Sequence, residues 1–168
     1  MRAQNEKSPA GHPPITGKEG SSMTIQVGFV PRGRNVMTIR VTSYRDSCLK
    51  GVLSGAQMEG ERVFSSAIEL LLLIEHMMDQ TNTPQRNEEP RSFPTAFMPA
   101  VPGAGNRPGG QAGTETLAVF QLNVMFRQNA TWQGSLLWVD QGQEAHFRSV
   151  LEMLRLLHGV LSGLQAEG

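Results

Sequence analysis

Few residues of this chain combine a reactive side chain with a spacing that would let it do chemistry. The histidines are His12, His76, His146 and His158, and no pair of them has a metal-ligand spacing with a carboxylate. Cys48 is the single cysteine, which excludes an intrachain disulfide and any metal site that needs several thiolates. We therefore expect no metal and no cofactor.

Glu69 and Glu152 have the residue type of a general acid and a general base. Each of them, however, follows a serine by three residues, which is the spacing of a helix capping box: Ser66 with Glu69, and Ser149 with Glu152. In that motif the serine side chain accepts a hydrogen bond from the first turn, and the glutamate accepts one from the N–H of the cap residue. The capping role accounts for both glutamates, so we predict structural caps and no catalytic residues.

The glycines at 103, 105, 109 and 110 resemble a phosphate-binding loop only in composition. They follow no expected strand, open no expected helix and include no lysine, so a linker explains them. The Cys48 thiol has no base fixed beside it that would activate it. These observations predict that the chain is not an enzyme.

The prolines separate the stretches that can fold from those that connect them. Four prolines lie at or before Pro31 and six lie between Pro84 and Pro108, whereas 37–79 and 120–162 contain none. Proline removes a backbone donor, so its absence marks segments able to form helices and strands. We predict a disordered tail at 1–23, a first unit at 24–79, a Pro/Gly-rich linker at 80–116 and a second unit at 117–163. Phe93 and Phe97 suggest that part of the linker docks on a surface.

The two proline-free stretches resemble each other. Shifting 37–79 by 83 positions aligns it with 120–162 without a gap and gives nine identical pairs, clustered around Phe-x-Ser-x-x-Glu-x-Leu-x-Leu. The identical pairs include Gly51/Gly134, Phe64/Phe147, Ser66/Ser149, Glu69/Glu152 and Leu71/Leu154. This pattern predicts an internal duplication.

Each copy reads as three strands followed by one helix. Alternating apolar residues such as Met37, Ile39 and Val41 are typical of a half-buried strand, and the period changes to that of a helix after each serine cap. Gly163 is the expected stop of the second helix. One unit alone buries too little surface to be stable. We therefore predict an α+β domain in which two βββα units form one joint, pseudo-twofold structure, with two helices and either one six-stranded antiparallel sheet or two packed three-stranded sheets.

Two surfaces are candidates for binding. Strict alternation places Arg40, Tyr44, Lys50 and Arg127 together on the outward face of the sheet, where cationic and aromatic side chains suit single-stranded nucleic acid. The first helix is apolar at Leu72 where the second has Arg155, which predicts an exposed patch of Leu72, Leu73 and Met77 for self-association or a protein partner. The charge favours an ordinary solvated sheet face over a nucleic-acid surface, because residues 37–79 have four basic and six acidic side chains and the whole chain has a formal charge of zero.

Three phrases resemble a group of short hypothetical proteins from anaerobic gut bacteria: Pro-Gln-Arg-Asn-Glu-Glu-Pro-Arg-Ser-Phe at 84–93, Arg-Gln-Asn-Ala-Thr-Trp-Gln-Gly at 127–134, and Phe-Arg-Ser-Val-Leu-Glu-Met-Leu at 147–154. The resemblance covers most of 37–162 and implies a shared fold without an activity. The order of strands followed by a helix is also similar in topology to PUR-repeat and Whirly proteins, which bind single-stranded nucleic acid. Those repeats usually have four strands per helix, and their contact motif is not recognisable here.

The leading interpretation is a non-catalytic, cytoplasmic interaction module, with single-stranded nucleic-acid binding as the alternative. The N-terminal residues lack the apolar run of a signal peptide. The longest apolar stretch, Leu70 to Ile74, is far shorter than the roughly 20 residues that span a bilayer. We therefore expect no membrane association.

Overall fold

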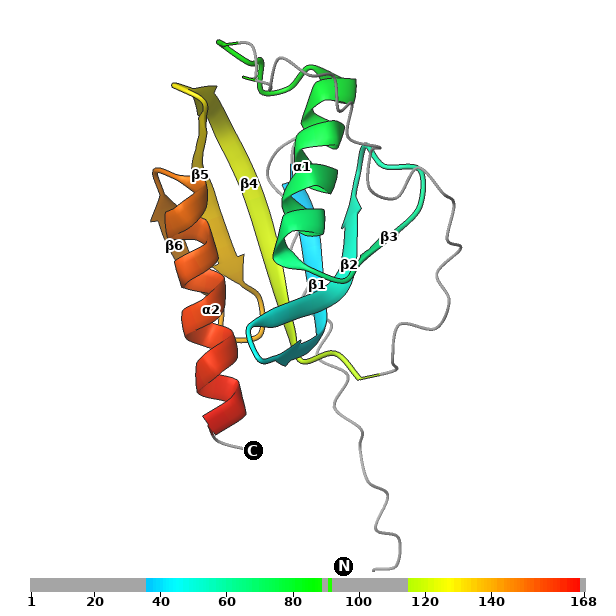
Figure 1. Ribbon diagram of the computed structural model, residues 1–168, viewed down its shortest axis with the longest axis vertical. Coiled ribbons are helices and arrows are strands. Elements are labelled where there is room, and N and C mark those ends of the chain that lie inside the picture. The colour runs from blue at the N-terminus through cyan, green and yellow to red at the C-terminus, as the bar shows by residue number, and fades with distance from the viewer. Residues whose placement is uncertain (1–35, 89–90, 92–114, 167–168) are drawn as a thin grey trace, which may run out of the picture. The chain divides into compact units, whose positions relative to one another are not determined.

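Both proline-free stretches form three strands and a helix (Figure 1). The computed structural model describes residues 36–88, 91 and 115–166. In chain order the elements are β1 (Val36–Arg45), β2 (Cys48–Gly55), β3 (Arg62–Phe64), α1 (Ala67–Thr81), β4 (Ala118–Gln128), β5 (Thr131–Trp138), β6 (Gln143–Phe147) and α2 (Val150–Ala166). The predictions for the tail at 1–23, for Phe93 and Phe97, and for the glycines at 103–110 lie outside the described residues.

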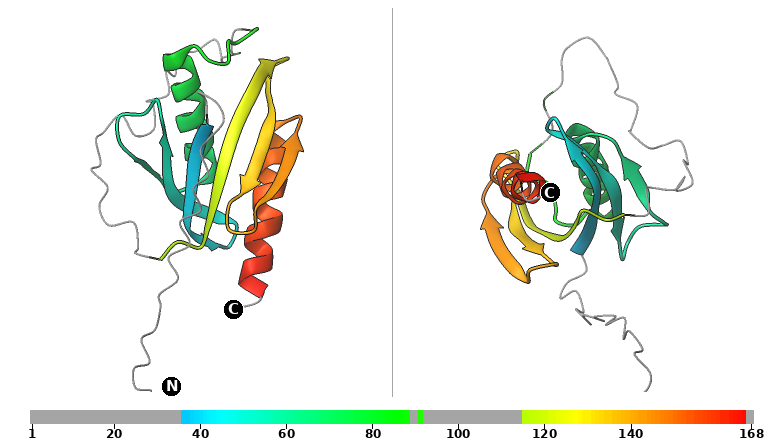
Figure 2. Two further views of the ribbon diagram at one scale, coloured as in Figure 1. Left: turned by 180° about the vertical axis from the view of Figure 1, so that it is seen from behind. Right: turned by 90° about the horizontal axis from the view of Figure 1, so that it is seen from below.

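The six strands form one antiparallel sheet in the order β3-β2-β1-β4-β5-β6. The α+β prediction of an antiparallel sheet with two helices is therefore confirmed, and the alternative of two packed sheets is wrong. β1 and β4 pair at the centre, and Thr38 lies opposite Gln121, the residue 83 positions later. Both helices cover the same face of the sheet, α1 over β2 and β3 and α2 over β5 and β6 (Figures 1 and 2). We call the other side the open face.

The core lies between the sheet and the helices. The strand residues that alternate toward the helices are apolar because that face excludes water, and they pack on helix residues at a spacing of three and four. The fully buried side chains include Ile39, Leu53, Phe64, Leu70 and Ile74 from the first half and Phe120, Leu122, Phe147, Met153 and Leu157 from the second. The sheet is continuous across β1 and β4, and residues of both halves belong to one core.

A β-bulge interrupts each of the two long strands at matching places. The register shifts between Val41 and Ser43 in β1, and between Val124 and Phe126 in β4. A bulge inserts one extra residue, so every side chain beyond it moves to the opposite face of the sheet. Tyr44 and Arg127 therefore point toward the helices, and the prediction that they lie on the outward face is wrong.

Both helices begin with a serine cap. The Ser66 hydroxyl accepts a hydrogen bond from the Glu69 N–H at 3.1 Å, and the Ser149 hydroxyl accepts one from the Glu152 N–H at 3.2 Å. The glutamates reach one residue further back than predicted, because their carboxylates accept from the N–H groups of Ser65 and Arg148, which precede the caps. The expected stop at Gly163 is also wrong. A helical glycine is tolerated at a cost of about 1 kcal/mol, and α2 continues to Ala166 while Leu164 packs on the core.

Glu152 is expected to contribute to stability only above acidic pH. Hydrogen bonds from the Arg148 side chain and backbone hold the pKa of the Glu152 carboxyl below its usual value. A carboxyl with a lowered folded-state pKa stabilises the protein above its unfolded pKa, and this contribution disappears as the pH falls through the folded value. Glu152→Gln should therefore flatten the acid limb of a plot of unfolding free energy against pH. Glu144→Gln, which removes the carboxyl of an exposed glutamate in β6, is the control for the change in net charge.

Candidate protein-interaction site

A buried arginine joins β4 to α1 at one end of the sheet. The Arg127 side chain is 4% exposed, and its Nη2 lies 2.6 Å from Glu75 Oε1 and 2.7 Å from Asp79 Oδ1. Arg86 binds the same two carboxylates, and the Trp132 indole N–H donates to Glu75 Oε2 at 2.8 Å. Charged groups of this kind are stable in a protein interior only when they are paired and hydrogen-bonded. We call these five residues the arginine cluster.

Four local features bring the arginine cluster together. The bulge in β4 turns Arg127 toward α1, and a two-residue turn at Asn129 and Ala130, both with positive φ, returns the chain as β5 so that Trp132 lies beside Arg127. Glu75 and Asp79 are four residues apart and therefore share one face of α1. The chain leaves α1 at Asn82 in the left-handed conformation and carries Arg86 back to β4.

Next to the arginine cluster is an open depression of about 660 Å³. Its apolar wall consists of Leu71 and Leu72 from α1, Trp132 from β5 and Val150 from α2. Its polar wall consists of the arginine cluster residues Glu75, Arg86 and Arg127, of Glu88 and Arg91, and of the turn at 129–131. Leu72 is 40% exposed at this site, so a large apolar side chain faces solvent there. We call this surface the Leu72 depression.

The predicted apolar patch is only partly at the surface. Leu73 is buried in the core on the side of α1 that faces the sheet, so its assignment to an exposed patch is wrong. Met77 is half-buried and packs beside Val36 and Gly55, away from the Leu72 depression. The prediction from sequence grouped Leu72 and Leu73 on one surface, but consecutive residues on a helix point about 100° apart. Of the three, only Leu72 contributes to the depression.

A second polar contact joins β1 to α2 at the other end of the sheet. The Tyr44 hydroxyl is hydrogen-bonded to His158 Nδ1, and the two rings meet edge to face with centroids 5.9 Å apart. The Ser162 hydroxyl lies 3.2 Å from the same nitrogen. Tyr44, His158 and Ser162 stand 83 positions from Arg127, Glu75 and Asp79 respectively. The same three places therefore hold ion pairs at one end and hydrogen bonds among a tyrosine, a histidine and a serine at the other.

The four residues proposed for nucleic acid do not form one surface. Arg40 and Lys50 remain on the open face, where Arg40 is paired with both oxygens of Glu61. Tyr44 and Arg127 are 8% and 5% exposed and point toward the helices. The open face therefore lacks Tyr44 beside its cationic side chains, and its exposed aromatic side chain is instead Phe126, which lies opposite Gln133 and is 51% exposed.

The arginine cluster is built to hold its members in place. Both Glu75 oxygens accept hydrogen bonds, one from Arg127 and Arg86 and the other from Trp132. Among the described residues, no group of three or more His, Cys, Asp or Glu side chains is arranged to hold a metal ion. The exposed Cys48 thiol lies 3.4 Å from the Ser65 carbonyl.

Sequence reasoning missed Glu75, Asp79, Arg86 and Trp132 as members of a site. Two signals pointed to the end of β4. Met125 and Phe126 are consecutive apolar residues that break the alternation, which is typical of a bulge, and Asn129 is a residue type that favours a tight hairpin turn. No signal in the sequence connects Arg127 to Glu75, which lies 52 positions away.

Comparison with known proteins gave no relatives: no family model, no curated protein and no solved structure matches this chain. None of the helices in the described ranges is long and apolar enough to cross a membrane. The geometry of the described residues is therefore the basis for a functional proposal.

Proposed function

We propose that this chain is a non-catalytic, cytoplasmic interaction module that self-associates through the Leu72 depression. The observation that carries the proposal is a leucine 40% exposed beside a cavity whose other walls include Leu71, Trp132 and Val150. Apolar side chains grouped around a concave surface favour burial against another protein. The arginine cluster supports this surface by fixing Trp132 through its indole N–H.

The two halves supply an internal comparison for this surface. The positions equivalent to Leu72, Trp132 and Val150 hold Arg155, Leu49 and Ala67, which are charged or smaller. The apolar wall of the Leu72 depression is therefore not repeated at the equivalent positions and does not follow from the architecture alone. Such a local difference favours a specific contact over nonspecific apolar association.

Sedimentation over a range of concentrations tests the proposal. Wild-type protein is expected to form dimers as its concentration rises, and Leu72→Arg is expected to remain monomeric because a charge would be buried at the contact. Ile68→Arg is the matched control: Ile68 is 71% exposed on the same helix but does not line the depression, so that variant should dimerise like the wild type. A wild type that stays monomeric throughout would contradict the proposal, as would equal behaviour of the two variants.

Single-stranded nucleic acid on the open face is the alternative, and the geometry favours it less. Arg40 is neutralised by Glu61, and Tyr44 and Arg127 are directed to the other side of the sheet. Binding of this kind depends strongly on salt. Tight, salt-sensitive binding to a mixed-sequence oligonucleotide that is lost in Arg40→Ala with Lys50→Ala would support the alternative.

The proposal includes an origin of the fold by duplication of one βββα unit. Its support is the agreement of unrelated details at a spacing of 83: the two bulges, the turns at Asp46–Ser47 and Asn129–Ala130, the glycine–phenylalanine pairs, the serine caps, and the contacts of Tyr44 and Arg127 with the opposite helix. The Leu72 depression, which residues of both copies line, then arose by divergence of the copies after the duplication.

A further inference from the structure

β6 leaves one edge of the sheet open. Among the described residues this strand pairs with β5 alone, and it is the last strand in the order of the sheet. It is the outermost strand on the side of α2 (Figures 1 and 2). Backbone N–H and C=O groups that point outward from such an edge are able to pair with a further strand. The edge strand at the other end of the sheet, β3, has only three residues, whereas β6 has five.

The hairpin between β4 and β5 determines which residues of β6 have free backbone groups. In a two-residue hairpin the pair that flanks the turn, here Gln128 and Thr131, exchanges both of its hydrogen bonds. Backbone directions alternate along a strand, so Leu136 of β5 turns its N–H and C=O groups toward β6, where its partner is Ala145. The residues on either side of Ala145 therefore direct their N–H and C=O groups away from the sheet.

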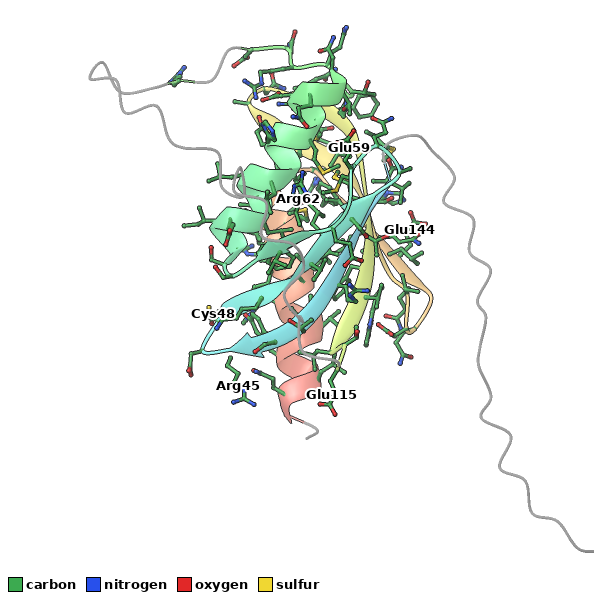
Figure 3. All side chains as sticks on the ribbon, turned by 90° about the vertical axis from the view of Figure 1, so that its right-hand side faces the viewer. Arg45, Cys48, Glu59, Arg62, Glu115 and Glu144 are labelled. Atoms are coloured by element: carbon green, nitrogen blue, oxygen red, sulfur yellow. The ribbon has the colours of Figure 1, made fainter. Side chains whose placement is uncertain are left out.

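Those two residues are Glu144 and His146, whose side chains have opposite charges when the histidine is protonated. Both side chains are exposed. Phe147 points into the core, so the alternation of side chains along a strand places Glu144 and His146 on the open face. Figure 3 shows Glu144 on the side of the sheet away from the helices. Arg148, the next charged residue along the chain, is paired with Glu152.

We propose that β6 pairs with β6 of a second copy of this chain, antiparallel and about a twofold axis at Ala145. In this register each residue from Gln143 to Phe147 lies opposite a residue of the same five in the second copy. Glu144 lies opposite His146 of the second copy, and the twofold axis repeats this pair, so the free backbone groups of both residues are used. The two sheets become one continuous sheet. This surface is separate from the Leu72 depression and does not depend on it.

The charges select this register over the two nearest symmetric ones. Ladder hydrogen bonds require outward-facing residues opposite each other, which a twofold axis at Glu144 or at His146 would also provide. The first of these axes places Glu144 opposite Glu144, and the second places His146 opposite His146. Like charges directly opposite each other on a sheet are unfavourable, whereas unlike charges attract. An axis at Ala145 is the one that places unlike charges opposite each other.

The equivalent strand of the first half lacks this complementarity. The positions equivalent to Glu144 and His146 are Glu61 and Val63. Glu61 is bound by Arg40 of its own sheet, and Val63 has no charge to offer a second copy. A charge on an edge strand normally prevents pairing with another chain. In β6 the two charges instead match each other across a twofold axis, which favours pairing between copies.

The pairing is expected to strengthen in mild acid. Histidine side chains change charge between about pH 5 and 8, and glutamate keeps its charge to lower pH. From β5, Ser135 lies opposite His146 and Leu137 lies opposite Glu144, and neither of them titrates. The charged neighbours along the chain are Glu144 itself and the paired Arg148. Protonation of His146 therefore places a cation opposite Glu144 of the second copy.

Sedimentation of the full-length Leu72→Arg chain at pH 8 and at pH 6 tests the proposal. This variant lacks the contact of the proposed function, so its association in mild acid reports β6 alone. We expect it to dimerise about tenfold more tightly at pH 6 than at pH 8, the factor expected from two exposed ion pairs. Amide exchange at Glu144 and His146 should slow as the dimer forms. Adding Glu59→Lys, a charge change at an exposed residue outside β6, should leave this association unchanged.

An exchange of the two charges tests the register. In the Leu72→Arg chain, Glu144→Lys with His146→Glu again places unlike charges opposite each other, so this variant should dimerise at pH 8 as well as at pH 6. His146→Glu alone places glutamates opposite each other and should abolish the dimer at both pH values. The proposal is overturned if Leu72→Arg stays monomeric at pH 6, or if His146→Glu associates as strongly as the variant with exchanged charges. Wild type compared with Leu72→Arg at pH 8 tests the proposed function separately.

Discussion

Alanine in place of Gly134 or Gly51 is expected to destabilise the protein severely. A Cβ atom at Gly134 would lie 2.0 Å from the Asn123 carbonyl oxygen, and one at Gly51 would lie 2.2 Å from the Arg40 carbonyl oxygen. Both obstacles are backbone atoms of the adjacent strand, which cannot move without breaking the sheet. We expect a loss of about 3 kcal/mol or more in the free energy of unfolding, since overpacking against backbone cannot relax. Urea unfolding followed by circular dichroism measures it.

The chain contains a suitable control for that substitution. Gly159 lies within α2, and an added Cβ would meet no atom within 4 Å. Gly159→Ala should raise the free energy of unfolding by about 0.5 to 1 kcal/mol, because alanine favours helix and restricts the unfolded chain. If Gly134→Ala and Gly159→Ala unfold at the same urea concentration, the close approach of β4 and β5 described here is incorrect.

The two strand glycines also explain part of the repeat. Gly51 pairs with Phe64 and Gly134 pairs with Phe147 across neighbouring strands. In each pair the tip of the ring would lie within 3.1 Å of an added Cβ, so the phenylalanine covers the space that the glycine leaves open. Aromatic residues commonly compensate a strand glycine in this way. Aligning the two halves of the sequence identifies these glycines and phenylalanines as identical pairs. The pairing of the strands explains why each glycine occurs together with a phenylalanine.

Patterns with a short period predicted most of the architecture. Alternation located strands in both proline-free stretches, and the serine–glutamate spacing located the starts of the helices at Ala67 and Val150. These features are local, because a hydrophobic period or a cap is set by residues within one or two turns. The order of the strands depends on residues far apart in the sequence, so short-period patterns did not predict the pairing of β1 with β4.

The wrong placements of Tyr44 and Arg127 have one cause: a single extra residue in a strand reverses the face on which every later side chain lies. Extrapolating the alternation of β1 beyond Val41 placed Tyr44 on the open face, and the same step in β4 misplaced Arg127. A bulge leaves no unique signature in composition, so a strict period of two carries the error to every later residue. The two bulges therefore remove two of the four residues, Tyr44 and Arg127, from the proposed nucleic-acid surface.

The bulges also create the contacts that hold the halves together. Because they redirect Tyr44 and Arg127 to the helix side, each central strand reaches the helix of the other half: Tyr44 contacts His158, and Arg127 contacts Glu75. These side chains lie 114 and 52 positions apart in sequence. Contacts across halves at such separations cannot be read from local patterns, and they are the reason that one half is incomplete without the other.

The contact between Arg127 and α1 is expected to dominate the stability of this arrangement. Arg127→Met removes a guanidinium that is 4% exposed and leaves the Glu75 carboxylate partly uncompensated in a site where it is 31% exposed. Breaking a buried pair by removing one partner costs about 3 kcal/mol. Arg40→Met is the matched control, because Arg40 is also paired with a glutamate but is 41% exposed. Its loss should be below about 1 kcal/mol. Thermal and urea unfolding of the two variants therefore decide whether Arg127 joins the halves: equal, small losses would show that it does not.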